Sequence, residues 1–154
     1  MDLGLAGKVA LVCGASTGIG FAVAEELAAN GVTLVICARD RQRLEAARAL
    51  LAPTTDNVLA VPGDLSTAEG VHAITSRALT TYGRVDVLVT NTGGPKPGPA
   101  DSHEWAAWEA AVALLLKSVV ELTRALLPGM RERRWGRVIA ITSMAVKQPV
   151  DNLV

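Results

Sequence analysis

KVALVCGASTGIG, residues 8–20, joins a short apolar run to a turn that contains three glycines. The run from Lys8 to Cys13 is continuous and apolar, which is typical of a strand buried on both faces of a parallel sheet. Apolar residues then recur at helical spacing from Ile19 to Asn30, and Gly31 can supply the left-handed end of that helix. The segment therefore predicts a strand, a glycine-rich turn and a helix in succession.

The alternation of strand and helix continues along the chain. Further strands are predicted at 33–38, 57–61, 85–89 and 136–142, and further helices at 40–51, 66–82 and about 103–130, with Ser66-Thr-Ala-Glu69 as a capping box. The Gly/Pro-rich segment 93–99 is interpreted as a functional loop rather than a linker. Five strands with short connections indicate an α/β fold, a doubly wound parallel sheet with helices on both faces.

The composition fits a single domain over residues 1–154 and argues against several kinds of partner. Half of the residues are hydrophobic, and 15 basic residues balance 15 acidic ones. That balance leaves no overall field to attract nucleic acid or an anionic membrane, and no apolar run is long enough to span a bilayer. The opening segment lacks the pattern of a targeting signal, so we expect a cytoplasmic protein that acts on small molecules.

The glycine-rich turn is suited to hold the phosphates of a dinucleotide. Glycines let the backbone approach a pyrophosphate, and the helix that follows offers free amides and the positive end of its dipole. A P-loop would need Gly-Lys-Ser/Thr, whereas the chain has Gly18-Ile19-Gly20. A tight turn without a ligand is the remaining alternative.

Several segments together resemble the short-chain dehydrogenase/reductase family. Gly14-x-x-x-Gly18-x-Gly20 has its glycine spacing, Asp64-Leu65 resembles its adenine-contacting segment, and Asn91-Thr92-Gly93 resembles its Asn-Asn-Ala-Gly. The resemblance covers the chain and implies a Rossmann-type fold whose last strands and helices are missing here, so that the dinucleotide-binding domain is incomplete at its C-terminus. It implies a cofactor site formed by Gly14, Ser16, Thr17, Gly18, Ile19, Gly20, Arg39, Asp64, Leu65, Asn91, Thr92 and Gly93.

The end of the second predicted strand favours NADP(H), with NAD(H) left open. A carboxylate there would bind a free ribose 2′-hydroxyl and repel a 2′-phosphate, but the residue is Ala38. Arg39 follows, and a guanidinium matches a phosphate with two parallel hydrogen bonds. Against this, Asp40 is adjacent, Thr17 stands where many NADP-preferring relatives carry a second basic residue, and an arginine at this place is ordinarily a solvated charge.

The resemblance assigns one catalytic residue, Ser143, at the end of the fifth predicted strand. In the family this hydroxyl orients the substrate carbonyl, while a Tyr followed four residues later by a Lys transfers the proton. That Tyr is expected near position 156, and the family's proton-relay Asn is replaced by Leu115, which cannot hydrogen-bond. A cap on the following turn is the structural alternative for Ser143.

The function that follows is an NADP(H)-dependent oxidoreductase acting on a small carbonyl or secondary alcohol. The alternative is a nucleotide-binding or oligomerising protein without turnover, in which the proton relay is lost or truncated. The segment 146–154 resembles a divergent, 3-oxoacyl-reductase-like branch, and we expect the 154-residue chain alone to be inactive.

The long predicted helix carries features that concern assembly. The stretch 110–116 is apolar over nearly two turns, and the family resemblance implies a homodimer or homotetramer built on this helix. Trp105 and Trp108 are interpreted as a packing stripe, and Arg131, Arg133 and Arg134 as compensation for the negative end of the helix.

The remaining conspicuous residues are given structural roles. Cys13 and Cys37 are interpreted as small buried hydrophobes rather than a disulfide or metal ligands. His72 and His103 are isolated from other ligand types, so solvated or capping roles are expected and no metal site is predicted.

Overall fold

A computed structural model describes residues 3–148, 150 and 151 of the chain. Within these residues lies a parallel five-stranded sheet in the order β3-β2-β1-β4-β5. Its strands are β1 (Val9–Cys13), β2 (Thr33–Ala38), β3 (Val58–Pro62), β4 (Val87–Thr90) and β5 (Arg137–Ala140). The predicted doubly wound sheet is confirmed. Residues 1, 2, 149 and 152–154, which belong to the predicted 1–154 domain and the 146–154 segment, lie outside the described residues.

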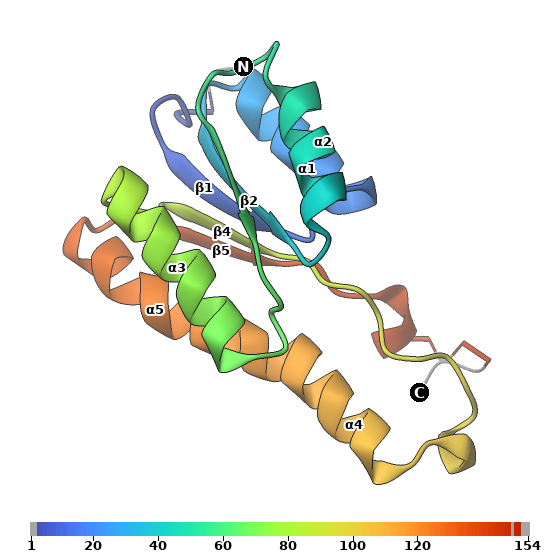
Figure 1. The fold of residues 1–154 in the computed structure, drawn as a ribbon. Helices are drawn as coiled ribbons and strands as arrows, with labels where there is room; N and C mark the ends of the chain where they lie inside the picture. Colours follow the sequence, from blue (N-terminus) through green and yellow to red (C-terminus); the bar gives the residue numbers. More distant parts are fainter. Residues whose placement is uncertain (1–2, 149, 152–154) are drawn as a thin grey trace.

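Helices cover both faces of the sheet (Figure 1). One face carries α1 (Gly18–Ala29) and α2 (Arg41–Leu51), and the other carries α3 (Ala68–Tyr82) and α5 (Ser118–Glu132). A π-helical turn, Ala113–Lys117, joins α5 to α4 (Trp105–Val112), which projects beyond the sheet. The order of the strands reverses between β1 and β4, and open α/β sheets bind ligands at such a point.

The central strand β1 shows why the strands read as continuous apolar runs. Leu11 and Cys13 pack into the core beneath α3 and α5, where Ile74 and Leu122 also lie. Ala10 and Val12 point to the opposite core, against α1 and α2. Successive side chains of a strand alternate between the two faces, so burial on both sides requires an apolar residue at every position.

The residues that end or cap the helices agree with the sequence-based predictions, with one correction. Gly31 and Gly83 adopt the left-handed conformation, with φ of 74° and 70°, as expected after α1 and α3. The predicted capping box that starts at Ser66 is wrong by one residue, because the hydroxyl of Thr67 accepts the bond from the amide of Gly70. Ser66 instead donates its own amide and hydroxyl to Asp64.

The long predicted helix is found, but its apolar face lies open. It begins at Trp105 rather than near 103 and changes to π-helical geometry at 113–117. The expected packing stripe is wrong within the described residues, since Trp105 is 72% exposed and Trp108 37% exposed. Val112 and Leu116 are also exposed.

The fifth strand lies at the outer edge of the sheet. The predicted range 136–142 shortens to Arg137–Ala140, and all four of its residues are exposed. Among the described residues its only neighbour is β4. An open, partly apolar edge of this kind offers unpaired backbone groups to another strand.

Asp86 holds β1, β4 and the end of α5 together. Its carboxylate has no exposed surface, and it accepts a hydrogen bond of 3.0 Å from the amide of Val9. It pairs with Arg84 at 2.7 Å and with Arg133 at 3.4 Å. Arg133 also donates to the Val85 carbonyl at 3.0 Å, a link that compensation of a helix end does not include. Burial raises the pKa of Asp86, but the bonds from Arg84 and Val9 and both arginine charges outweigh burial and lower it.

Replacing Asp86 by Asn should destabilise the protein in a pH-dependent way. The variant loses the charge that Arg84 and Arg133 face, and we expect the free energy of unfolding to fall by about 2 kcal/mol at pH 7. Because the folded-state pKa is lowered, this stabilisation is present above the unfolded pKa of about 3.9 and disappears as the pH falls through the folded value. Urea unfolding of both proteins between pH 7 and pH 3 measures the difference.

Asp56→Asn is the matched control, because Asp56 is exposed and the described residues give it no hydrogen bond or ion pair. It should change stability by less than about 0.5 kcal/mol. A gap between wild type and Asp86→Asn that stays constant down to pH 3 would show that the charge of Asp86 is not the source.

Candidate functional site

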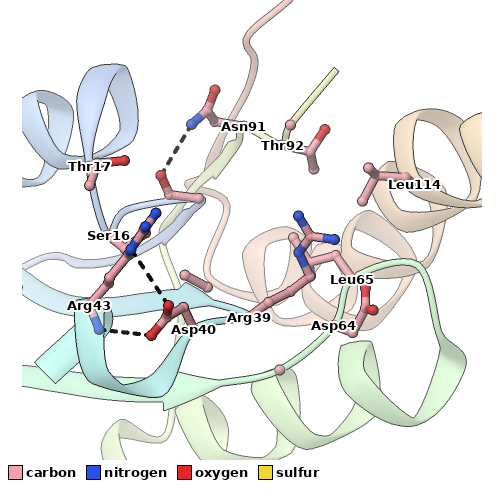
Figure 2. Close-up of a pocket in the computed structure, with 14 residues that line it drawn as sticks. Ser16, Thr17, Arg39, Asp40, Arg43, Asp64, Leu65, Asn91, Thr92 and Leu114 are labelled. Atoms are coloured by element: carbon pink, nitrogen blue, oxygen red, sulfur yellow. Dashed lines mark hydrogen bonds and ion pairs between the residues drawn. The ribbon is translucent and has the colours of Figure 1, made fainter. Parts of the chain in front are cut away.

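A cavity of about 360 Å³ opens where the carboxyl ends of β1, β2 and β4 meet (Figure 2). Its wall is formed mostly by polar and small residues that follow the first four strands, with Leu114 from the π-helical turn: Gly14, Ser16, Thr17, Ala38, Arg39, Asp40, Arg43, Gly63, Asp64, Leu65, Asn91, Thr92, Gly93 and Leu114. The sheet therefore brings together segments that are far apart in the sequence at its switch point.

Most of the predicted cofactor residues line this cavity, but four predicted site residues do not. Gly18, Ile19 and Gly20 form the first turn of α1 beside it, and Ile19 is 62% exposed. Ser143 lies at a separate hollow formed by residues 142–148.

The glycines of the turn are required by close packing. Gly14 has φ of 58°, and a Cβ there would lie 2.6 Å from the carbonyl oxygen of Asn91. A Cβ on Gly20 would collide with the carbonyl group of Gly14. The side-chain amide of Asn91 lies 3.4 Å from that same carbonyl oxygen and donates to it. The turn, α1 and the end of β4 thus share a contact that no side chain larger than hydrogen can enter.

Asp64 is oriented by its own loop. One carboxylate oxygen accepts from the amide of Ser66 at 2.9 Å and from its hydroxyl at 2.8 Å. These two bonds lower the pKa of Asp64, and the nearby charge of Arg39 adds a smaller effect in the same direction. A Cβ on Gly70 would collide with the backbone of Asp64, so the first turn of α3 packs directly on this loop.

Two arginines face the cavity from the end of β2 and the start of α2. Arg39 follows Ala38, and its guanidinium makes no hydrogen bond or ion pair with any described residue. Arg43, which the sequence did not single out, also lines the cavity, with its Nε 3.6 Å from a carboxylate oxygen of Asp40. Asp40 caps α2, and the spacing of three residues predicts that Arg43 lies beside it, but no signal in the sequence places this pair at the cavity.

Leu114 and Leu115 face different spaces. Leu114 lines the cavity, although only Leu115 was predicted to matter. Leu115 lines an apolar cavity of about 270 Å³ together with Trp108 and His103. Adjacent positions of a helical turn point in different directions around its axis, which explains the separation.

Ser143 takes the structural alternative that the sequence left open. Its hydroxyl oxygen accepts a 3.1 Å hydrogen bond from the amide of Ala145 and caps the 3₁₀ turn Met144–Val146. The hydroxyl hydrogen has no acceptor among the described residues, so it remains available to a ligand.

The buried cysteines lie beneath the cavity. Cys13 and Cys37 are opposite each other in the β1–β2 pair, and both are buried and free, as expected for small hydrophobes. A hydrogen bond with Cys37 and burial raise the pKa of the Cys13 thiol. Neither thiol is poised for nucleophilic chemistry in this state.

The match to known proteins covers nearly the whole sequence. Residues 8–154 match the profile of the short chain dehydrogenase family. The chain belongs to the short-chain dehydrogenase family. The chain is 33% identical over 141 residues to D-beta-hydroxybutyrate dehydrogenase of Cupriavidus necator, covering 90% of this chain and 54% of that protein. It is 39% identical over 140 residues to nodulation protein G of a Rhizobium species, covering 91% and 56%.

Solved structures of the family superpose closely on this chain. L-sorbose reductase from Gluconobacter frateurii, complexed with NADPH and L-sorbose, has a TM-score of 0.94 and 37% identity, covering 97% of this chain and 57% of that one. A metagenomic short-chain oxidoreductase in complex with NADP has a TM-score of 0.89 and 38% identity, covering 96% and 67%. The chain spans about half the length of the curated relatives it matches.

Two kinds of feature are absent from the described residues. No helix there has the length and apolar character to cross a membrane. No three His, Cys, Asp or Glu side chains within residues 3–148, 150 and 151 are grouped to hold a metal ion.

Gly20→Ala tests the close contact at the glycine-rich turn. Alanine is intrinsically the better helix former by about 1 kcal/mol, but its methyl group would overlap the Gly14 carbonyl. We expect the clash to prevail and lower the free energy of unfolding by about 1–3 kcal/mol, measured by urea unfolding.

Gly94→Ala is the control, since Gly94 does not adopt a left-handed φ and a Cβ there meets nothing within 4 Å. It should leave stability within about 0.5 kcal/mol of wild type. Stabilisation by Gly20→Ala would contradict the steric constraint.

Proposed function

We propose that the chain forms the nucleotide-binding part of an NADP(H)-dependent oxidoreductase that transfers hydride between nicotinamide and a carbonyl or secondary alcohol. The observation that carries the proposal is the guanidinium of Arg39, which makes no hydrogen bond or ion pair with a described residue, in a cavity where the preceding residue, Ala38, offers no carboxylate to a ribose hydroxyl. The L-sorbose reductase complexed with NADPH and the oxidoreductase in complex with NADP support it.

The residues of the cavity fit a dinucleotide. Among the described residues no side chain caps the start of α1, so its first backbone amides are free for a pyrophosphate, which the helix dipole attracts. In the proposal, the turn with Ser16 and Thr17 binds the pyrophosphate, and Gly18 and Ile19 continue that cradle. Asp64 and Leu65 bind the adenine, Arg39 binds the 2′-phosphate, and residues 91–93 border the ribose of the nicotinamide half. When bound, the nicotinamide supplies or accepts the hydride.

Ser143 is the residue that we propose touches the substrate. Its oxygen is fixed by the Ala145 amide, so its hydrogen can donate to a carbonyl oxygen and orient that group.

A protein of this class is also proposed to assemble as a homodimer or homotetramer, which the open apolar face of α4 supports. The molar mass of the protein in solution tests the assembly.

Arg39→Ala should weaken NADPH binding by about ten-fold and change NADH binding by less than two-fold. The guanidinium would form charge-assisted hydrogen bonds that are partly screened by solvent, and only NADPH presents the 2′-phosphate. Calorimetric titration with both nucleotides measures the two affinities.

Arg77→Ala removes the same charge from an exposed position on α3, outside the cavity, and should change neither affinity. Wild-type protein that binds NADH tightly and does not respond to NADPH would overturn the cofactor assignment.

A second candidate is a nucleotide-binding protein without turnover. Two observations favour it. Leu115, which cannot hydrogen-bond, stands at the position of the family's proton-relay Asn, and Ser143 lies outside the nucleotide cavity. Turnover of a panel of small ketones with NADPH by the complete protein separates the candidates, because a binding protein would consume no cofactor with any ketone.

Ser143→Ala gives the corresponding prediction for the enzyme. Loss of one preorganised hydrogen-bond donor should lower kcat by about a hundred-fold while the dissociation constant for NADPH stays unchanged. Ser76→Ala on α3, outside the nucleotide cavity and the Ser143 hollow, is the control. Unchanged kcat in Ser143→Ala would remove Ser143 from the chemistry.

A further inference from the structure

The cavity holds a second arginine to which the proposed function gives no role. Arg43 is the third residue of α2, and Figure 2 shows its side chain rising towards the turn that carries Ser16. Its Nε lies 3.6 Å from a carboxylate oxygen of Asp40, which is long for a hydrogen bond. The two terminal nitrogens of its guanidinium have no partner among the described residues.

Asp40 has two tasks, and only one of them needs its charge. One carboxylate oxygen accepts the amide of Arg43 at 3.0 Å and caps α2. The other faces the side chain of Arg43, and the two side chains are 53% and 73% exposed. The cap therefore leaves a negative charge beside the cavity, and Arg43 offsets it.

An exchange of partners would cost little in free energy. Ion pairs between exposed side chains contribute only about 0–1 kcal/mol, so Arg43 can leave Asp40 easily. A phosphate monoester carries about two negative charges and three acceptor oxygens, so it is the stronger partner for a free guanidinium. Arg39 and Arg43 both line the cavity, from the end of β2 and the first turn of α2, and their long side chains would allow both to reach a phosphate bound between them.

We propose that Arg43 is a second side chain for the ribose phosphate of the cofactor, held in reserve by Asp40 and transferred to the phosphate on binding. This inference rests on the proposed NADP(H) site and adds a specificity-determining residue to it. Arg43 would discriminate against a 2′-hydroxyl, since a hydroxyl offers no charge to replace that of Asp40. Asp40 sets the strength of the discrimination, because its negative charge both competes for Arg43 and repels the phosphate.

A double-mutant cycle in the full protein tests the proposal. NADPH, NADH and 2′,5′-ADP are titrated by calorimetry into wild type, Arg43→Gln, Asp40→Asn and the double variant. Asn caps a helix as well as Asp does, so Asp40→Asn removes the charge without the cap. Arg48→Gln is the matched control, because Arg48 pairs with Glu45 on the same helix and does not line the cavity.

The expected result is that Arg43→Gln weakens NADPH and 2′,5′-ADP by about ten-fold and NADH by less than two-fold. Asp40→Asn should tighten NADPH by a few-fold, and Arg43→Gln should still weaken NADPH when Asn stands at position 40. Arg48→Gln should change none of these affinities. Unaltered NADH binding shows that each variant is folded.

Other outcomes overturn the inference and can be told apart. Equal NADPH affinity in wild type and Arg43→Gln would mean that Arg43 does not bind the phosphate. An effect that vanishes in the Asp40→Asn background would mean that Arg43 only neutralises Asp40. Absence of binding of NADPH and 2′,5′-ADP to wild type would refute the proposed function itself, and the inference with it.

Discussion

The proposed nucleotide site depends on the contact of three backbone segments around Gly14. The end of β1, the first turn of α1 at Gly20 and the end of β4 at Asn91 approach so closely that only hydrogen fits between them. This contact fixes where α1 starts relative to the sheet, and hence where its free amides point. β1 lies at the centre of the sheet and pairs with β2 on one side and β4 on the other. It therefore fixes the positions of Arg39, which follows β2, and of Asn91, which follows β4.

The sequence predicted the fold well where the signal is local. A strand buried on two faces must be apolar at each position, and a helix that ends at Gly31 or Gly83 shows its left-handed residue directly. It failed where two local solutions compete, as at Ser66 and Thr67, because Asp64 engages the first hydroxyl and leaves the second to cap α3. It also failed at Trp105, because an apolar helical face indicates preference for burial but not what covers it.

The site was predicted in part, for a similar reason. Gly14, Arg39 and Asp64 stand at strand ends, which parallel pairing gathers at one edge of the sheet. Arg43 reads in sequence as an ordinary solvated arginine, since its place on the cavity wall follows from the packing of α2. Asp86 could not be recognised either, because it accepts the amide of Val9, 77 residues away.

Asp40 and Asp86 show how burial decides what an ion pair can do. Asp86 has no exposed surface, and removing an arginine from it would strand a charge in the core, so its pairs with Arg84 and Arg133 are fixed parts of the fold. Asp40 is half exposed, and water can take over its charge when Arg43 departs. The same two residue types thus form a permanent link in the core and an exchangeable one at the cavity, and only the exchangeable one can respond to a ligand.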